Sequence, residues 1–141
     1  MNRLRAVEPA DRQLLRRLLA DYLLELDGSV TPYPYFDAYW SEPDRLPFLI
    51  EADREVAGLC LVRVLDGGWH IAEFSVRPEK RREGIGRATV DEIARHARSD
   101  GAAHLEANVY PHNAGGLAFW QAVGFEIVSR DDEKIVTRRT L

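Results

Sequence analysis

Cysteine is nearly missing from this chain of 141 residues, which contains one, at position 60. Cys60 lies in the apolar segment 58–62, and a single cysteine excludes an intramolecular disulfide, so we expect a core residue of a cytoplasmic protein. No apolar run approaches the roughly 18 residues of a membrane-spanning helix, and the first residues lack the apolar segment of a secretion signal. The sequence therefore predicts a protein that is neither secreted nor bound to a membrane.

A large excess of charge of one sign is also missing. The 19 basic and 23 acidic residues give a net charge of -4, which argues against a general nucleic-acid binder. The apolar share of 45% and the charged share of 30% are ordinary for a folded soluble protein. A chain of this length suits one domain, so we expect residues 1–141 to form a single domain.

The spacing of apolar residues predicts a series of strands and helices. Recurrence at three and four residues marks the helices, and alternation or short apolar runs mark the strands. The expected elements are a strand at 3–7, a helix at 9–27, a loop with a short helix at 29–46, strands at 47–52, 55–65 and 69–76, a helix at 85–98, a strand at 103–110, a helix at 113–123, and strands at 125–129 and 134–140. The fold class is α/β, with a mixed, mostly antiparallel central sheet flanked by helices.

The six residues 81–86, Arg-Arg-Glu-Gly-Ile-Gly, join an expected strand to an expected helix. The start of a helix leaves main-chain N–H groups without partners, and the helix dipole adds positive charge there. The two glycines remove the Cβ atoms that would keep an anion away from the main chain. Basic side chains also outnumber acidic ones nearby: Arg77, Lys80, Arg81, Arg82 and Arg87 against Glu79 and Glu83. This segment predicts a phosphate-binding loop.

Several known kinds of anion-binding loop fit the segment poorly. A Walker loop needs Gly-Lys-Ser/Thr, whereas Arg87 and Ala88 follow the glycines here. A dinucleotide loop needs a small residue where Thr89 stands. An RNA-binding patch needs aromatic residues among the basic ones, and these lie elsewhere. A capped helix start with solvated arginines is the structural alternative.

Two motifs together resemble one protein family. Residues 76–86 read Val-Arg-Pro-Glu-Lys-Arg-Arg-Glu-Gly-Ile-Gly, and further along come Asn113, Phe119-Trp120 and Val123-Gly124-Phe125. The first is similar to the Val-x-Pro-x-x-Arg-x-x-Gly-Ile-Gly signature of the GNAT acetyltransferases, and the second to their Asn-x-x-Ala…Tyr…Leu-Gly-Phe segment. The resemblance covers about residues 69–129. It implies a single-domain GNAT-like fold and an acetyl-CoA-dependent N-acetyltransferase that moves acetyl directly from the thioester to a primary amine.

The resemblance also implies which residues contact acetyl-CoA as cosubstrate. In the family, the strand before the loop contacts the pantetheine arm through its main chain and polarises the thioester carbonyl. The loop holds the pyrophosphate, and an asparagine of the next helix contacts the cofactor; here this asparagine also suits an N-cap. The matching residues are Phe74, Ser75, Val76, Arg81, Arg82, Glu83, Gly84, Ile85, Gly86, Arg87 and Asn113.

A general base is useful because an alkyl amine is almost fully protonated at neutral pH. Glu73 is the sole acid of the segment 69–76, and a carboxylate in such apolar surroundings should have a raised pKa. We therefore expect Glu73 to be the catalytic base. The alternatives are that Glu73 pairs with a nearby arginine, or that His70 is the base.

One residue departs from the family pattern. Trp120 stands where the family has the tyrosine that protonates the leaving thiolate, and an indole cannot donate in that way. Tyr110 is the expected replacement. Water is a second source of the proton, and a thiol with a pKa near 8.5 also leaves readily as thiolate without an acid.

The acceptor is the least defined part of the predicted reaction. In the family the first helix and its following loop shape the acceptor pocket, and acidic and aromatic side chains there suit a cationic amine. The corresponding residues are Asp27, Tyr33, Tyr35, Tyr39 and Trp40, for which packing is the alternative role.

These residues favour a small-molecule amine as substrate. Acetylation of a protein lysine or N-terminus, and a non-catalytic acyl-CoA-binding domain, are the alternatives. The histidines lack the spacing of metal ligands, so we expect no metal. We expect no nucleic-acid partner, and a homodimer is common in the family.

Overall fold

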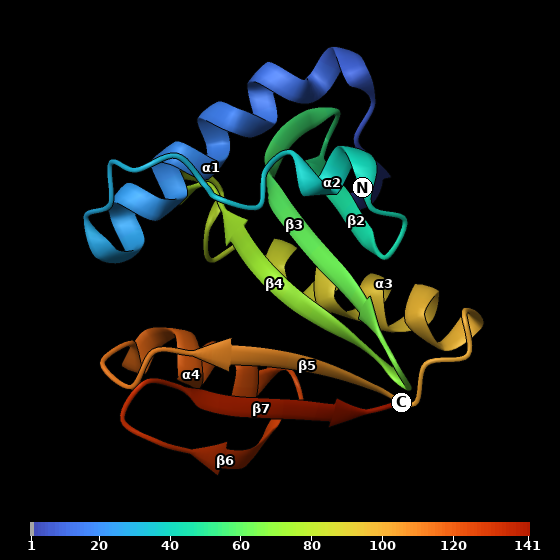
Figure 1. Cartoon of the computed structure of the whole chain (residues 1–141), viewed down its shortest axis with the longest axis vertical. Helices are drawn as coiled ribbons and strands as arrows, with labels where there is room; N and C mark the ends of the chain where they lie inside the picture. The colour runs from blue at the N-terminus through green and yellow to red at the C-terminus, as the bar shows by residue number, and fades with distance from the viewer. Residues whose placement is uncertain (1) are drawn as a thin grey trace.

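Within the residues that the structure describes, 2–141, seven strands form one mixed sheet in this computed structural model (Figure 1). The strands are β1 (Asn2–Ala6), β2 (Arg45–Ala52), β3 (Glu55–Leu65), β4 (Gly68–Val76), β5 (His104–Val109), β6 (Glu126–Arg130) and β7 (Ile135–Thr140). The helices are α1 (Arg12–Asp27), α2 (Ala38–Ser41), α3 (Ile85–Ser99) and α4 (Ala114–Ala122), with 3₁₀ helices η1 (Pro9–Asp11) and η2 (Pro78–Lys80). All of the predicted strands and helices are present.

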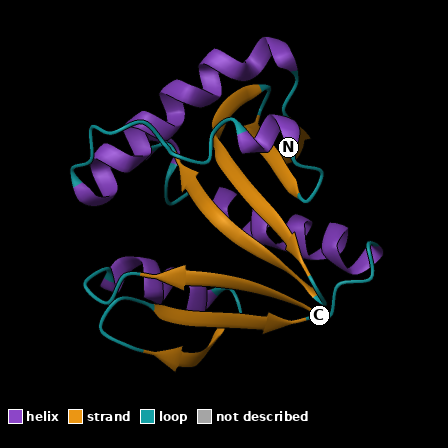
Figure 2. Ribbon diagram, in the orientation of Figure 1, coloured by secondary structure: helices purple, strands orange, loops and turns teal. Residues whose placement is uncertain are grey.

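The sheet has the order β1-β2-β3-β4-β5-β7-β6. Neighbouring strands are antiparallel except for β4 and β5, which are parallel because α3 carries the chain back across the sheet between them. The prediction of an α/β fold with a mixed, mostly antiparallel sheet is confirmed. Helices lie on both faces of the sheet (Figure 2).

Two apolar cores hold the helices on the sheet. On one face, α3 buries the stripe that its sequence period predicts, including Ile85, Val90 and Ile93. On the other face, Leu15 and Leu19 of α1 belong to a second core. Both cores are needed to bury a sheet that is apolar on its two sides.

Apolar residues of the helices form stripes rather than continuous apolar segments. Within residues 2–141, no helix has the length and apolar character needed to cross a membrane.

Cys60 of β3 is fully buried in the α3 core, as its apolar neighbours predicted. Burial raises the pKa of its thiol.

A β-bulge in β4 decides which face of the sheet the next residues occupy. Leu61 of β3 pairs with Glu73, but the adjacent Val62 pairs with Ile71, so Ala72 is an extra residue without a partner in β3. Side chains alternate along β3, and therefore Ile71 and Glu73 lie on opposite faces. Ile71 enters the α3 core, whereas Glu73 shares the α1 face with Leu61.

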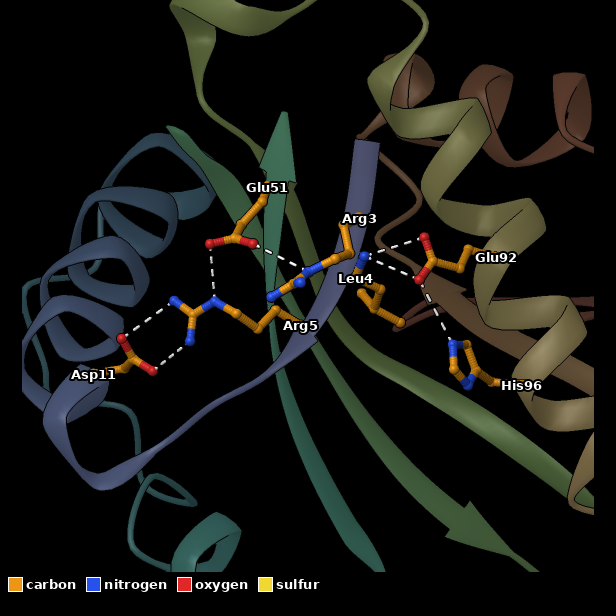
Figure 3. Close-up of polar contacts among 7 residues, drawn as sticks. All are labelled: Arg3, Leu4, Arg5, Asp11, Glu51, Glu92 and His96. Atoms are coloured by element: carbon orange, nitrogen blue, oxygen red, sulfur yellow. Dashed lines mark hydrogen bonds and ion pairs between the residues drawn. The ribbon is translucent and has the colours of Figure 1, made fainter. Parts of the chain in front are cut away.

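Polar contacts fix the edge strand β1 to elements on both sides of the sheet (Figure 3). Arg5 donates to Glu51 of β2 at 2.9 Å and to Asp11 of η1 at 2.8 Å. The main-chain N–H of Leu4 donates to the carboxylate of Glu92 in α3, at 3.0 and 3.1 Å. An edge N–H group is thus satisfied by a helix, which also holds α3 in place against the sheet.

The close approach of β3 and β4 leads to a stability prediction. A Cβ atom at Gly58 would lie 2.0 Å from the main-chain oxygen of Ser75. We expect Gly58→Ala to lower the free energy of unfolding by about 1–3 kcal/mol, because the strands must shift. Gly115→Ala is the matched control, since no atom lies within 4 Å of that Cβ and a helix favours alanine. Urea unfolding measures both, and equal effects would contradict the packing described here.

Candidate active site

The parallel strands β4 and β5 separate toward their carboxyl ends (Figures 1 and 2). Their pairing stops at Ile71 and Ala107, although β4 continues to Val76 and β5 to Val109. A cleft of about 1520 Å³ occupies this region and is lined by both strands, α1, the loop after it, the β4–α3 loop and α4. This exceeds the roughly 300–1,000 Å³ of a typical ligand pocket, which leaves room for two ligands.

The end of β4 turns main-chain N–H groups toward this cleft. The N–H of Arg77 donates to the carbonyl of Ala57 in β3 at 2.7 Å. Because N–H groups alternate between the two edges of a strand, those of Ser75 and Glu73 also point to β3. Those of Phe74 and Val76 therefore point the other way, into the opening beyond the end of the β4–β5 pairing.

The predicted phosphate loop has an unusual backbone. Arg82 and Gly84 both have positive φ, 64° and 81°, a conformation that favours glycine and that arranges N–H groups around an anion. Gly84 is the N-cap of α3 and no side chain caps the helix within residues 2–141. The hydrogen bonds of the helix begin with the N–H of Ala88, which donates to the carbonyl of Gly84. The N–H groups just before Ala88 are consequently free of helical partners.

Gly86 has a packing role in addition to the anion-binding role that the sequence predicts. A Cβ atom at Gly86 would lie 2.9 Å from the ring of Phe119 in α4, whereas a Cβ at Gly84 would meet nothing within 4 Å. The Phe119 ring in turn stacks on that of Phe74, with centroids 5.6 Å apart. The second glycine thus allows α3 and α4 to pack closely beneath the end of β4.

Glu73 lies half-buried on the α1 wall of the cleft. Burial, and to a smaller extent the nearby charge of Asp27, raise the pKa of its carboxyl, whereas hydrogen bonds from the Tyr22 and Tyr33 hydroxyls lower it; the net result is a pKa of about 7. Burial also raises the pKa of both tyrosines, which stay protonated donors. The partners of Glu73 are therefore phenols, and not the arginine that the sequence left as an alternative.

Tyr22 was missed as a site residue by sequence reasoning. It falls on the apolar stripe of the first helix, where a tyrosine is typical of core packing. Nothing in its spacing indicates the contact with Glu73, because that contact depends on the Ala72 bulge.

His70 lies on the same face of β4 as Glu73 but within the paired part of the strand. Its Nδ1 is 3.4 Å from Oε1 of Glu106 in β5, and burial lowers its pKa. His70 also lines the cleft, but its Nδ1 lies beside Glu106 and its lowered pKa makes it a weaker base, which favours Glu73. Within residues 2–141, no group of three or more His, Cys, Asp or Glu side chains is placed to hold a metal ion.

Tyr110 and Trp120 both line the cleft but differ in how far they are exposed. Tyr110 follows β5, is 43% exposed, and stacks on His112 with ring centroids 5.4 Å apart. Trp120 is buried, and its ring contacts those of Phe74 and Phe125. Of the two, Tyr110 is the exposed residue with a hydroxyl group, whereas the Trp120 indole is packed among aromatic rings.

Asn113 is the N-cap of α4, as its position predicted. Its Oδ1 accepts a hydrogen bond of 2.9 Å from the N–H of Gly116. A Cβ at Gly116 would lie 2.5 Å from Nδ2 of Asn113, so the glycine that replaces the family's alanine allows this cap. Asn113 also lines the cleft.

The residues expected around the acceptor fall into two groups. Asp27, Tyr33 and Tyr35 line the cleft. Tyr39 and Trp40 do not line it, and pack between α2 and its neighbours instead. The two aromatic residues of α2 therefore have the packing role that the sequence left open.

Comparison with known proteins agrees with the fold. The family model described as the acetyltransferase (GNAT) family matches residues 12–125. The chain belongs to this family, and the predicted resemblance is confirmed. It is accordingly an acetyltransferase by class. No curated protein sequence gives a match.

Solved structures share the fold along the whole chain. An acetyltransferase from Thermus thermophilus has a TM-score of 0.86 and 26% identity, covering 100% of this chain and 97% of that chain. The PaiA N-acetyltransferase of Thermoplasma acidophilum, in complex with coenzyme A, has a TM-score of 0.82 and 14% identity, with coverage of 100% and 99%. A GNAT family acetyltransferase from Elizabethkingia anophelis with acetyl-CoA bound has a TM-score of 0.73 and 16% identity, with coverage of 99% and 98%.

The raised pKa of Glu73 predicts a stability effect that does not depend on any substrate. Between the ordinary carboxyl pKa and about 7, the unfolded chain loses this proton before the folded protein does, so stability falls as pH rises through this range. Glu73→Gln removes the titration and should become more stable than the parent protein by up to about 3 kcal/mol near pH 8. Near pH 4 the two should be close.

Urea unfolding at several pH values tests this expectation. Glu126→Gln, on the exposed edge strand β6, controls for the loss of one negative charge. A stability difference between Glu73→Gln and the parent protein that is the same at pH 4 and pH 8 would contradict the burial described for this carboxyl.

Proposed function

We propose that the protein is an acetyl-CoA-dependent N-acetyltransferase that moves acetyl from the thioester directly to the primary amine of a small molecule. The observation that carries this proposal is the juxtaposition of three features in one cleft. These are the free N–H groups at the end of β4, the open start of α3, and the half-buried carboxyl of Glu73. Membership of the family and its relatives with coenzyme A or acetyl-CoA bound support acetyl-CoA as the donor.

Glu73 has the protonation behaviour that a general base needs. With a pKa of about 7, an appreciable fraction is carboxylate at neutral pH, and the proton it accepts is released again. An alkyl ammonium near its usual pKa of about 10.4 must lose a proton before its nitrogen can attack a carbonyl. We assign this proton transfer to Glu73, directly or through one water.

Main-chain donors bind the other substrate in this proposal. Acetyl-CoA supplies an acetyl group activated as a thioester. The N–H groups of Phe74 and Val76 are assigned to the pantetheine arm and the thioester carbonyl, where a donor stabilises the charge that develops on oxygen. Ser75 contributes to the same stretch of main chain. The N–H groups of residues 82–87 and the side chains of Arg82 and Arg87 are assigned to the diphosphate, and Asn113 to a further contact.

Tyr110 is the proposed donor of a proton to the departing sulfur. It replaces the family's usual tyrosine, whose position is held by the buried Trp120. The departure of Trp120 from the pattern also favours a second candidate function, a domain that binds acyl-CoA without catalysis.

We further propose one acetyltransferase domain over residues 1–141. A cytoplasmic location and a homodimer stay predictions from the sequence.

A turnover assay tests the proposed function. The protein is mixed with acetyl-CoA and either a panel of small primary amines or peptides with a free lysine or N-terminus, and thiol release and product mass are measured. Acetylation of a small amine is the expected result. Acetylation of peptides alone supports a protein substrate, binding without turnover supports the non-catalytic domain, and no heat on titration with coenzyme A overturns the proposal.

Variants should separate binding of the cofactor from chemistry. We expect Glu73→Gln to lower kcat at least about 100-fold with little change in the Kd for coenzyme A, because it removes the base alone. In the parent protein kcat/KM should rise with pH up to about 7, the pKa of Glu73. Arg82→Ala combined with Gly84→Val should weaken coenzyme A binding at least about tenfold, since it removes charge and distorts the loop. Equal cofactor affinities in both variants would count against these assignments.

A further inference from the structure

The guanidinium of Arg81 is already engaged by the protein itself. Nη1 and Nη2 donate to the two carboxylate oxygens of Glu25, at 2.9 and 2.5 Å, and Nε donates to the carbonyl of Val76 at 2.8 Å. The main-chain N–H of Arg81 donates to the carbonyl of Pro78. The Arg81 and Glu25 side chains are 41% and 47% exposed, and it is the paired, two-bond geometry that distinguishes this bridge from an ordinary surface ion pair. Most of the hydrogen-bonding capacity of Arg81 is therefore used before any ligand binds.

The other cations of the loop differ in how far they are engaged. Lys80 pairs with Glu55 at 2.8 Å, and Arg87 donates to the carbonyl of Ala122 at 3.0 Å. Arg82 is exposed, lies beside Gly84, and has no ion pair among residues 2–141. An anion at the start of α3 would thus find Arg82 available, whereas it would have to break existing hydrogen bonds to recruit Arg81.

The Arg81–Glu25 bridge joins the two walls of the cleft. Glu25 belongs to α1, which also supplies Tyr22 to Glu73, and Arg81 belongs to the β4–α3 loop. The acceptor side and the phosphate side of the proposed site are thus connected directly by one pair of side chains.

The bridge also lies where α1 has few other attachments. The fully buried side chains of α1 end at Leu19, although the helix continues to Asp27. Among the residues of α1 after Leu19, Glu25 is the only one that forms an ion pair with another residue of the described range 2–141. The position of Tyr22 relative to Glu73 therefore depends on half-buried contacts and on the hold that Arg81 has on Glu25.

We propose that Arg81 is a positioning residue, which through Glu25 holds the end of α1 and its Tyr22 against Glu73, rather than a side-chain ligand of the diphosphate. This inference rests on the proposed N-acetyltransferase function and changes the role that the sequence suggested for Arg81. Loss of the bridge raises the KM for the amine, whereas the affinity for coenzyme A depends on Arg82 and on the free N–H groups of the loop.

Conservative variants test the proposal with two kinetic readouts. Glu25→Gln keeps the shape of the carboxylate but removes its charge. Arg81→Lys keeps the charge but loses the two parallel N–H donors of the guanidinium. Each should raise the KM for the amine about three- to tenfold. Each should also move the rise of kcat/KM to higher pH, because release of Tyr22 removes a hydrogen bond that lowers the pKa of Glu73. The Kd for coenzyme A should change less than twofold. Arg82→Ala is the matched control, expected to weaken coenzyme A about tenfold with a smaller effect on amine KM.

The double variant Glu25→Gln with Arg81→Lys should be no worse than either single one, since both remove the same bridge. Three results would overturn the proposal. These are an unchanged amine KM in Glu25→Gln, a loss of coenzyme A affinity in Arg81→Lys as large as in Arg82→Ala, and tighter coenzyme A binding in Glu25→Gln. The last would mean that Glu25 competes with the diphosphate for Arg81.

Amide hydrogen exchange tests the bridge without any substrate. Exchange in residues 20–27 should accelerate severalfold in Glu25→Gln and in Arg81→Lys, and stay unchanged in Arg82→Ala. Unchanged exchange in all three would overturn the positioning role even if the enzyme is active. Faster exchange in a protein that acetylates no amine would instead support the bridge and reject the proposed function.

Discussion

The end of the β4–β5 pairing at Ile71 and Ala107 is the constraint on which the rest of the site depends. Main-chain N–H groups in a sheet are normally used by the neighbouring strand, and leaving them without one is unfavourable unless water or a ligand binds them. Here the two strands separate while β4 runs on to Val76. The opening supplies both the space of the cleft and the donors along its floor, before any side chain is considered.

Two local features then direct side chains into that opening. The extra residue Ala72 places Glu73 on the α1 face, where burial raises the pKa of its carboxyl to about 7. The close packing allowed by Gly86 brings α3 and α4 together under the end of β4, and so fixes where the open start of α3 lies. The carboxyl and the uncapped start of α3 are therefore held by opposite faces of the same strand.

Most of the fold could be predicted because helices and strands carry their own periodicity. The buried residues Ile85, Val90 and Ile93 of α3 follow the spacing read from the sequence, and Asn113 caps α4 as its residue type predicted. The bulge at Ala72 could not be predicted, because an alanine inside a strand carries no signal for it. The contact of Glu25 with Arg81 joins residues 56 positions apart, and an exposed acid on a helix has no pattern that identifies its partner.

The central claim, that N–H groups of the separated strand and of the α3 start bind the donor, is tested most directly by an NMR titration. Amide ¹H–¹⁵N signals of the labelled protein are followed while coenzyme A is added. We expect the largest shifts to include Phe74, Val76 and the amides of residues 82–87, with little change at β1. Shifts confined to other elements, or saturation without any change at Phe74 and Val76, would contradict it.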